Sequence, residues 1–111
     1  MNDAEFGERA EQALEELEDR LNQASADMEM EVEAGEGTIK LLFEDPHAGT
    51  FVLSANPPAK QLWLSARTTS FKFNWSDERG GFVYEKTGEP IDQLLGRLIS
   101  EQMGLAEAVS I

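Results

Sequence analysis

The sequence contains no cysteine among its 111 residues. This absence excludes disulfide bonds, thiolate zinc sites, cysteine-ligated iron–sulfur clusters and a cysteine nucleophile. Histidine is nearly absent too, because His47 is the only one, and it lies in a predicted turn where we expect a surface role. A metal ion held by this chain must therefore be bound by oxygen ligands, with at most one histidine.

Long apolar runs are also missing, and the first residues do not have the pattern of a secretory signal. No segment approaches the roughly 20 apolar residues that cross a membrane, and Met1–Glu5 lack a basic start followed by an apolar stretch. We therefore expect a soluble cytoplasmic protein. The sequence also lacks a glycine-rich phosphate loop, a nucleophile elbow and a metalloprotease helix. Pairs of carboxylates suited to a hydrolase occur by chance in so acidic a chain, so no catalytic residue is assigned.

Basic residues are scarce, with 9 against 22 acidic ones and a net charge of -13. Nucleic acids and anionic membranes bind basic surfaces, so neither is expected as a partner. The imbalance is concentrated at one end, because residues 1–36 hold 13 acidic and 2 basic side chains (net -11) and residues 37–111 hold 9 and 7 (net -2). Cations or a basic protein surface fit this charge, although an acidic surface can also serve solubility alone.

The first hydrophobic pattern has the period of a helix. Apolar residues recur every three or four positions from Phe6 to Leu21, and Asn2 and Glu5 occupy the positions of a capping box. We expect this helix to end between Leu21 and Ala24. From residue 27 the period changes to two, which predicts a strand with one apolar and one acidic face.

Short apolar segments separated by turn residues follow, and they predict about six strands in all. A turn is expected at Gly35–Gly37 and another at Asp45–Gly49. Pro90 suits the first position of a final helix, and Gly104 ends it before a short tail that should pack on the protein. The order predicts a single α+β domain over residues 1–111, a two-layer α–β sandwich whose antiparallel meander packs under an N-terminal and a C-terminal helix.

The helix and the first strand carry the densest carboxylates. Glu8, Glu11, Glu15 and Glu18 are spaced three, four and three apart, which we expect to place them opposite the leucines, with Glu16 and Asp19 beside them. The strand adds Asp27, Glu29, Glu31 and Glu33 on one face, at a repeat of roughly 6.6 Å. Parallel carboxylates do not converge on one ion, so we expect weak, exchangeable sites for hard cations such as Fe³⁺, Fe²⁺, Mn²⁺ or Ca²⁺. A solvated face that resists aggregation is the alternative.

A second candidate surface lies on the strand that follows the Asn56-Pro57-Pro58 break. Alternation places Leu62 and Leu64 toward the helices and Trp63 on the open sheet face. Tryptophan is enriched among binding hot spots, so Trp63 is a candidate anchor for a partner protein, or else it packs across neighbouring strands with nothing bound. Trp75 continues an apolar series and is expected in the core.

The order of elements, with the segment Asn56–Ser65 and the following Phe73–Trp75, resembles the frataxin family, particularly its bacterial branch. The resemblance covers nearly the whole chain, and its most specific part is Pro58–Ser65, which includes Gln61 and Trp63. It implies the α–β sandwich, iron binding along an acidic ridge, and a role in iron–sulfur cluster assembly through contact with a cysteine desulfurase and its scaffold protein.

Carried over by position, the resemblance assigns residues to two surfaces. The acidic ridge, which would hold Fe²⁺ or Fe³⁺ weakly, falls on Glu11, Glu15, Glu18, Asp19, Asp27, Glu29, Glu31 and Glu33. The partner-binding sheet surface falls on Asn56, Gln61 and Trp63. Asn22 and Gln23 stand where bacterial members commonly have acids, and Ala59 replaces a larger residue in the turn.

Three functions remain open. The first is an iron donor or regulator of the desulfurase–scaffold complex, expected as a monomer, with iron-dependent oligomers left open. The second is a protein-interaction module whose ridge binds basic surfaces and whose iron binding is incidental. The third, minor one is an enzyme, either a ferroxidase acting on the ridge or an unrelated hydrolase, whereas the first two require no covalent chemistry.

Overall fold

The computed structural model describes residues 1–45 and 47–111, so Pro46 of the predicted Asp45–Gly49 turn lies outside the described residues. Helix α1 (Asp3–Ser25) comes first, six strands follow, and helix α2 (Ile91–Met103) comes last. The strands are β1 (Met30–Gly35), β2 (Thr38–Phe43), β3 (Gly49–Asn56), β4 (Gln61–Ala66), β5 (Thr69–Ser76) and β6 (Gly81–Tyr84). None of the helices in the described ranges is long and apolar enough to cross a membrane.

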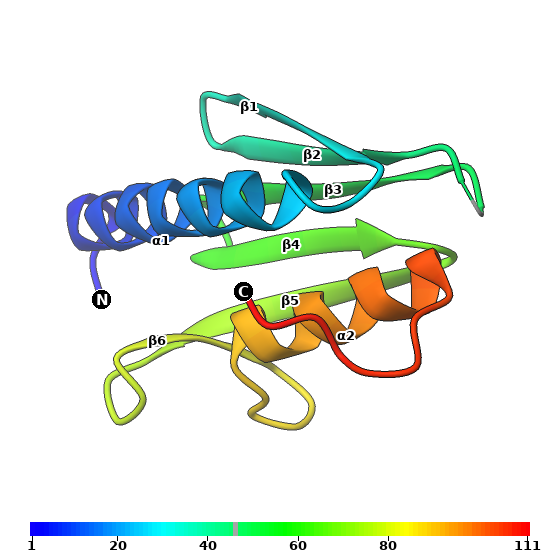
Figure 1. Ribbon diagram of the computed structural model, residues 1–111. Coiled ribbons are helices and arrows are strands. Elements are labelled where there is room, and N and C mark those ends of the chain that lie inside the picture. The colour runs from blue at the N-terminus through cyan, green and yellow to red at the C-terminus, as the bar shows by residue number, and fades with distance from the viewer. Residues whose placement is uncertain (46) are drawn as a thin grey trace.

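The six strands form one sheet in sequential order, and each pair is antiparallel. Both helices lie against the same face of this sheet (Figure 1). The predicted two-layer α+β sandwich and its meander are therefore confirmed. The other sheet face is open, and alternation along β4 places Leu62 and Leu64 in the core and Trp63 in solvent.

The helix ends follow from local chemistry. Asn2 caps α1, since its Oδ1 accepts a hydrogen bond from the N–H of Glu5 at 2.8 Å. Gly104 ends α2 in the left-handed conformation (φ 69°), which glycine adopts without strain. Pro90 is the N-cap of α2 and bridges Val83, so the helix begins one residue later than the sequence predicted.

The core lies between the sheet and the two helices. Its largest fully buried side chains are Phe6, Phe51, Phe73, Phe82, Leu21, Leu41, Leu62, Leu64, Leu94, Leu95 and Ile99. Trp75, expected in the core, is only partly buried at its margin, where its ring meets Phe82 edge-on at 5.3 Å between centroids. Its indole Nε1 donates to Asp77 at 2.8 Å, and this bond holds the ring near the surface.

The first strand begins later than its period-two pattern predicted. Residues 27–29 form the turn that leaves α1, since the N–H groups of Asp27 and Met28 donate to Ala24 and Ser25. Another bond, from the N–H of Met30 to the carbonyl of Met28, completes this turn. The ladder with β2 therefore starts only at Met30, opposite Phe43.

The C-terminal tail packs back along α2, as its composition predicted. Ser100 donates from Oγ to the carbonyl oxygens of Leu105 and Glu107, and Val109 and Ile111 pack on the core. The backbone of Val109 lies directly against Gly96 of α2. The tail therefore covers the helix because a glycine lets it approach closely.

Candidate functional site

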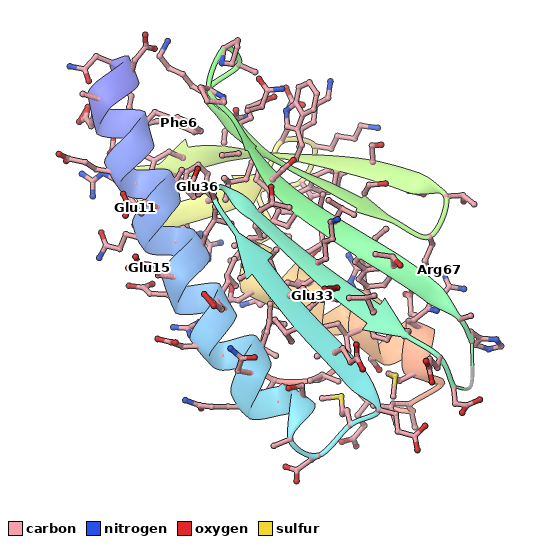
Figure 2. All side chains as sticks on the ribbon, turned by 90° about the horizontal axis from the view of Figure 1, so that it is seen from above. Phe6, Glu11, Glu15, Glu33, Glu36 and Arg67 are labelled. Atoms are coloured by element: carbon pink, nitrogen blue, oxygen red, sulfur yellow. The ribbon has the colours of Figure 1, made fainter. Side chains whose placement is uncertain are left out.

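The helix row, defined as Glu11, Glu15 and Glu18, lies on the flank of α1 that faces the β1–β2 hairpin (Figure 2). Glu11 and Glu15 are exposed, and Glu18 is half-buried. We expected Glu8, Glu11, Glu15 and Glu18 opposite the leucines, and only Glu8 lies there, about 160° from the buried stripe. For the helix row the expectation is wrong. Successive helical residues differ by about 100°, which places the row only about 100° from the buried stripe.

Asp19 lies on the far side of α1 from the buried stripe and is exposed. Asp27 and Glu29 are exposed in the turn between α1 and β1, not on the strand as predicted. Asp27 and Glu29 therefore do not continue the helix row along one surface. Asp19 lies one turn after Glu15 and adjoins the row on the solvent side of α1.

The strand pair, defined as Glu31 and Glu33, lies on β1 as predicted, and both side chains are exposed. Met30 is buried and Val32 partly buried against the core, so alternation turns the strand pair toward the open sheet face. Glu33 stands opposite Lys40 in the ladder with β2. The strand pair and the helix row therefore belong to neighbouring elements but project from different layers of the sandwich.

A groove of about 680 Å³ separates α1 from the tip of the β1–β2 hairpin, and we call it the hairpin groove. Its apolar lining includes Phe6, Ala10, Leu14, Ile39 and Pro57. Carboxylates also line it, from Asp3, the helix row and Glu36 at the hairpin turn. Figure 2 shows Glu36 beside Glu11, across the groove.

Asp3 and Glu36 are site residues that the sequence reasoning missed. The place of Glu36 between two glycines indicated a turn, but its position beside α1 follows only from the packing of the helix on the sheet. Asp3 was interpreted only as part of the helix start. It also forms an ion pair with Lys60 at 3.3 Å, which ties the start of α1 to the turn before β4.

These carboxylates line an open surface and do not enclose a metal ion. Among residues 1–45 and 47–111, no three histidine, cysteine, aspartate or glutamate side chains gather in a group able to hold a metal ion. Oxygen ligands bind hard cations tightly only when several converge within about 2.0–2.6 Å of the ion. The arrangement concentrates cations near the surface without enclosing one.

The sheet surface around Trp63 is an ordered cluster. Gln61 accepts from the indole Nε1 of Trp63 at 2.8 Å and donates to Asn74 Oδ1 at 3.0 Å. The ammonium of Lys72 lies 5.0 Å from the centre of the Trp63 ring, within cation–π range. Trp63 remains 38% exposed, so its neighbours fix the ring without covering it.

Lys72 and Asn74 were not assigned to this surface from the sequence, although their alternation with Phe73 indicated the open face. Asn56, a predicted site residue, stabilises a turn of the backbone. Its Oδ1 accepts from the N–H of Ala59 at 3.1 Å and so closes the turn before β4. Gln61 and Trp63 therefore form the core of the sheet surface, and Asn56 lies at its edge.

Comparison with known proteins gives a consistent result. A family model described as a frataxin-like domain matches residues 1–105. The iron-sulfur cluster assembly protein CyaY of Pseudomonas entomophila is 31% identical over 104 residues, covering 94% of this chain and 91% of that protein. The protein of the same name from Azotobacter vinelandii is 29% identical, with the same coverage.

The solved structure of a frataxin from Psychromonas ingrahamii resembles this one with a TM-score of 0.83 at 20% sequence identity. The match covers 99% of this chain and 97% of that chain. At this identity, the likeness shows that the two chains share a fold.

Proposed function

Because the chain belongs to the frataxin family, in its bacterial CyaY-like branch, we propose that it takes part in iron–sulfur cluster assembly as an iron-binding protein. It donates iron to, or regulates, a complex of cysteine desulfurase and scaffold protein. The observation that carries this proposal is the number of carboxylates that the helix row and the strand pair place on two neighbouring elements, α1 and β1. The names of the relatives support the assembly role.

Iron is cargo in this proposal. Carboxylate oxygens suit Fe²⁺ and Fe³⁺, and other hard divalent cations compete for them because the surface offers no selective geometry. An ion held by one or two exposed carboxylates exchanges quickly with water. A donor needs such release, so the open arrangement of Glu11, Glu15, Glu31 and Glu33 agrees with delivery better than with storage.

The partner contacts follow from the two surfaces. A basic region of the desulfurase docks on the acidic ridge, and the ordered face around Gln61 and Trp63 contacts the scaffold. The protein is a cytoplasmic monomer without iron. No covalent step is performed by this chain, so Fe²⁺ in its presence oxidises no faster than in buffer.

A second candidate is a protein-interaction module whose iron binding is incidental, and the hairpin groove favours it. Lysine and arginine have apolar stems and charged heads. The apolar floor at Phe6 and Leu14, below the carboxylates of Glu11 and Glu36, suits such side chains. In this case the basic segment of a partner occupies the groove, and the metal has no required role.

Glutamine variants separate the two candidates without changing side-chain size. The helix-row variant carries Glu11→Gln, Glu15→Gln and Glu18→Gln, and the strand-pair variant carries Glu31→Gln and Glu33→Gln. A control triple neutralises three exposed carboxylates elsewhere, Glu78→Gln, Glu85→Gln and Glu107→Gln. Anaerobic Fe²⁺ titration by calorimetry gives iron affinity, and interferometry gives desulfurase affinity with and without iron.

For an iron donor, the helix-row and strand-pair variants bind Fe²⁺ about tenfold more weakly, which corresponds to about 1.4 kcal/mol. The control triple stays close to the parent. An equal loss of iron affinity in all three variants would mean that iron is attracted by the overall negative charge and not by the ridge. This result would contradict the proposal. A ridge variant that loses iron and keeps its desulfurase affinity would instead exclude the interaction module.

A further inference from the structure

A second groove, of about 440 Å³, lies on the flank of α1 away from the helix row. Its walls are α1, the turn between β5 and β6, and the first turn of α2. Three arginines from two separate elements line it: Arg9 and Arg20 on α1 and Arg79 in the β5–β6 turn. We call it the arginine groove, defined by these arginines and Trp75.

Acids outnumber bases 22 to 9 in this chain, yet few bases are paired. Among residues 1–45 and 47–111, only Arg20, Lys60 and Arg97 form ion pairs. Neither Arg9 nor Arg79 uses its guanidinium in an ion pair or a hydrogen bond within these residues. Two guanidinium groups with unused donors therefore line one concave surface.

The remaining charges of the groove nearly balance. Arg20 reaches Asp92 at 3.5 Å, a long contact between half-exposed groups, and Glu16 is the other acid in the lining. The lining holds three arginines and two acids, and the carboxylate of Asp77 lies at its edge, bonded to Trp75. The groove is therefore close to neutral on a molecule whose net charge is -13. The helix row lies across the width of α1, roughly 10 Å, where physiological salt screens most of its field.

Arg9 is held in a geometry that leaves its donors available. Its guanidinium carbon lies 4.5 Å from the centre of the Trp75 ring. Stacking on an aromatic face uses the flat side of the guanidinium, and its N–H donors point outward in the plane of the group. The ring is fixed by the bond from Trp75 Nε1 to Asp77 and by its edge contact with Phe82.

Arg79 is positioned by its turn. Its backbone N–H donates to Ser76 Oγ at 3.1 Å, and the N–H of the following Gly80 donates to the carbonyl of Ser76 at 2.8 Å. Gly80 has φ 66°, so the turn depends on a conformation that favours glycine. The backbone that carries Arg79 is therefore fixed beside the groove before any ligand binds.

We propose that the arginine groove binds a small multivalent oxyanion, a phosphate- or carboxylate-bearing molecule that bridges Arg9 and Arg79. Guanidinium groups form paired, charge-assisted hydrogen bonds with such oxygens. The volume lies within the range of small-molecule sites, about 300–1,000 Å³. A large acidic partner is disfavoured, because it would approach many of the chain's 22 carboxylates as well as the groove.

The two tryptophans give the experiment an internal control. Trp75 lines the groove and Trp63 lies on the opposite face of the sheet, so their indole N–H signals in a ¹⁵N–¹H spectrum report on separate surfaces. The full chain is titrated with pyrophosphate and, separately, with citrate, each against sodium chloride of equal ionic strength. We expect the Trp75 indole and the amides of Arg79 and Gly80 to shift, and Trp63 to remain in place.

In the double variant Arg9→Gln and Arg79→Gln, we expect the affinity for both anions to fall at least about tenfold, because two charge-assisted contacts are lost. Lys40→Gln removes an exposed positive charge from β2, outside the groove, and leaves binding unchanged. If pyrophosphate alone binds, the ligand is a phosphate compound, and if citrate alone binds, it is a carboxylate.

Three outcomes would overturn the proposal. One is the absence of anion-specific shifts at Trp75. Another is an equal loss of binding in the Lys40→Gln variant, which would indicate general charge. The third is an acidic peptide that shifts the same signals with higher affinity than both anions, which would make the groove a protein-binding surface.

Discussion

Gly96 is buried on α2, where the backbone of the C-terminal tail lies against it. A methyl group at this position would overlap the carbonyl oxygen of Val109. Replacing glycine with alanine inside a helix normally stabilises by about 0.5–1 kcal/mol. We expect Gly96→Ala to have the opposite effect, because it displaces the tail that packs Val109 and Ile111 on the core. The measurement is the free energy of unfolding in urea.

Two controls isolate this effect. Gly7 is exposed at the margin of the hairpin groove, where a Cβ atom would have no neighbour within 4 Å, so Gly7→Ala should stabilise the protein by the ordinary helical amount. In a chain ending at Gly104 the tail is absent, and Gly96→Ala should become stabilising as well. If Gly96→Ala destabilises the shortened chain equally, the tail contact is not the cause.

Gln102 joins three parts of the molecule through one buried side chain, which is only 5% exposed. Its Nε2 donates to the carbonyl of His47 at 2.8 Å, and its Oε1 accepts from Arg67 at 3.1 Å. We expect Gln102→Met to cost about 1–2 kcal/mol, because both partners lose their bond while the volume is kept. Hydrogen exchange should accelerate at the amides of residues 47–49. Gln93→Met, at an exposed position of α2, is the control, and equal effects would refute the bridging role.

Gly96 and Gln102 make long-range contacts that local sequence patterns do not predict. Gly96 sits inside an apolar helix face, and no local rule assigns it a long-range neighbour in the tail. Gln102 lies one turn from the buried Ile99 and pairs with groups 55 and 35 residues away. By contrast, the cap at Asn2 depends only on residues within one turn, and it was predicted correctly.

At the scale of the elements, neighbouring carboxylates on α1 repel one another, and the proposed cation binding would explain why the helix keeps them. Neutralising the helix row with glutamine relieves four like-charge contacts at three or four residues' spacing, those of Glu8–Glu11, Glu11–Glu15, Glu15–Glu18 and Glu15–Asp19. Each such pair costs about 0.2–0.5 kcal/mol, so the helix-row variant should be about 1–2 kcal/mol more stable in urea. The gain should shrink in 1 M salt, where the screening length falls to about 3 Å.

The control triple tests whether this gain belongs to the helix. Glu78, Glu85 and Glu107 are exposed in turns and the tail, outside α1. Neutralising them reduces the net negative charge by the same amount and should stabilise the protein much less. A helix-row variant no more stable than this control would show that the spacing along α1 is not the source of strain.

The element order and the sheet were predictable because each rests on a local period. Alternation placed Leu62 and Leu64 inside and Trp63 outside, and glycines and prolines marked the turns. The start of β1 was predicted too early, because the exit of α1 uses the backbone of Asp27 and Met28 in turn bonds before the ladder can begin. Periodicity in side chains does not reveal which backbone groups are already bonded.

The candidate site was predicted as a list of residues, but its shape was not. The sequence identified Glu11, Glu15, Glu31 and Glu33 correctly as surface carboxylates. It could not place the helix row beside the hairpin, since that depends on how α1 lies across the sheet (Figure 2). The arginine groove was invisible for the same reason, because Arg9 and Arg79 are 70 residues apart and meet only through tertiary packing.

At the scale of the whole molecule, α1 separates two surfaces of different electrostatic character. One flank carries the helix row beside the hairpin groove, and the other carries Arg9 and Arg20 in the arginine groove. The first 36 residues supply 11 of the 13 net negative charges, yet both arginines of that segment are on the second flank. A cation at the helix row and the anion proposed for the arginine groove would therefore use different side chains of the same helix.

The acidic field also predicts how the stability of the whole protein responds to cations. Ions that bind the folded ridge more tightly than the unfolded chain stabilise the folded state by mass action. With a dissociation constant of about 1 mM, 10 mM Ca²⁺ adds about 1.4 kcal/mol, or roughly 5 °C in Tm for a domain of this size. Sodium chloride of equal ionic strength should add less, because it screens repulsion without bridging carboxylates.

Variants of the ridge test whether the stabilising cations bind there. Combining the helix-row and strand-pair substitutions should remove most of the extra calcium effect, whereas the control triple should keep it. The comparison is made as a difference between calcium and sodium for each variant, since neutralising charge changes Tm by itself. An equal calcium effect in the combined variant and the control triple would mean that calcium stabilises the protein through its net charge. It would contradict preferential binding of calcium at the ridge.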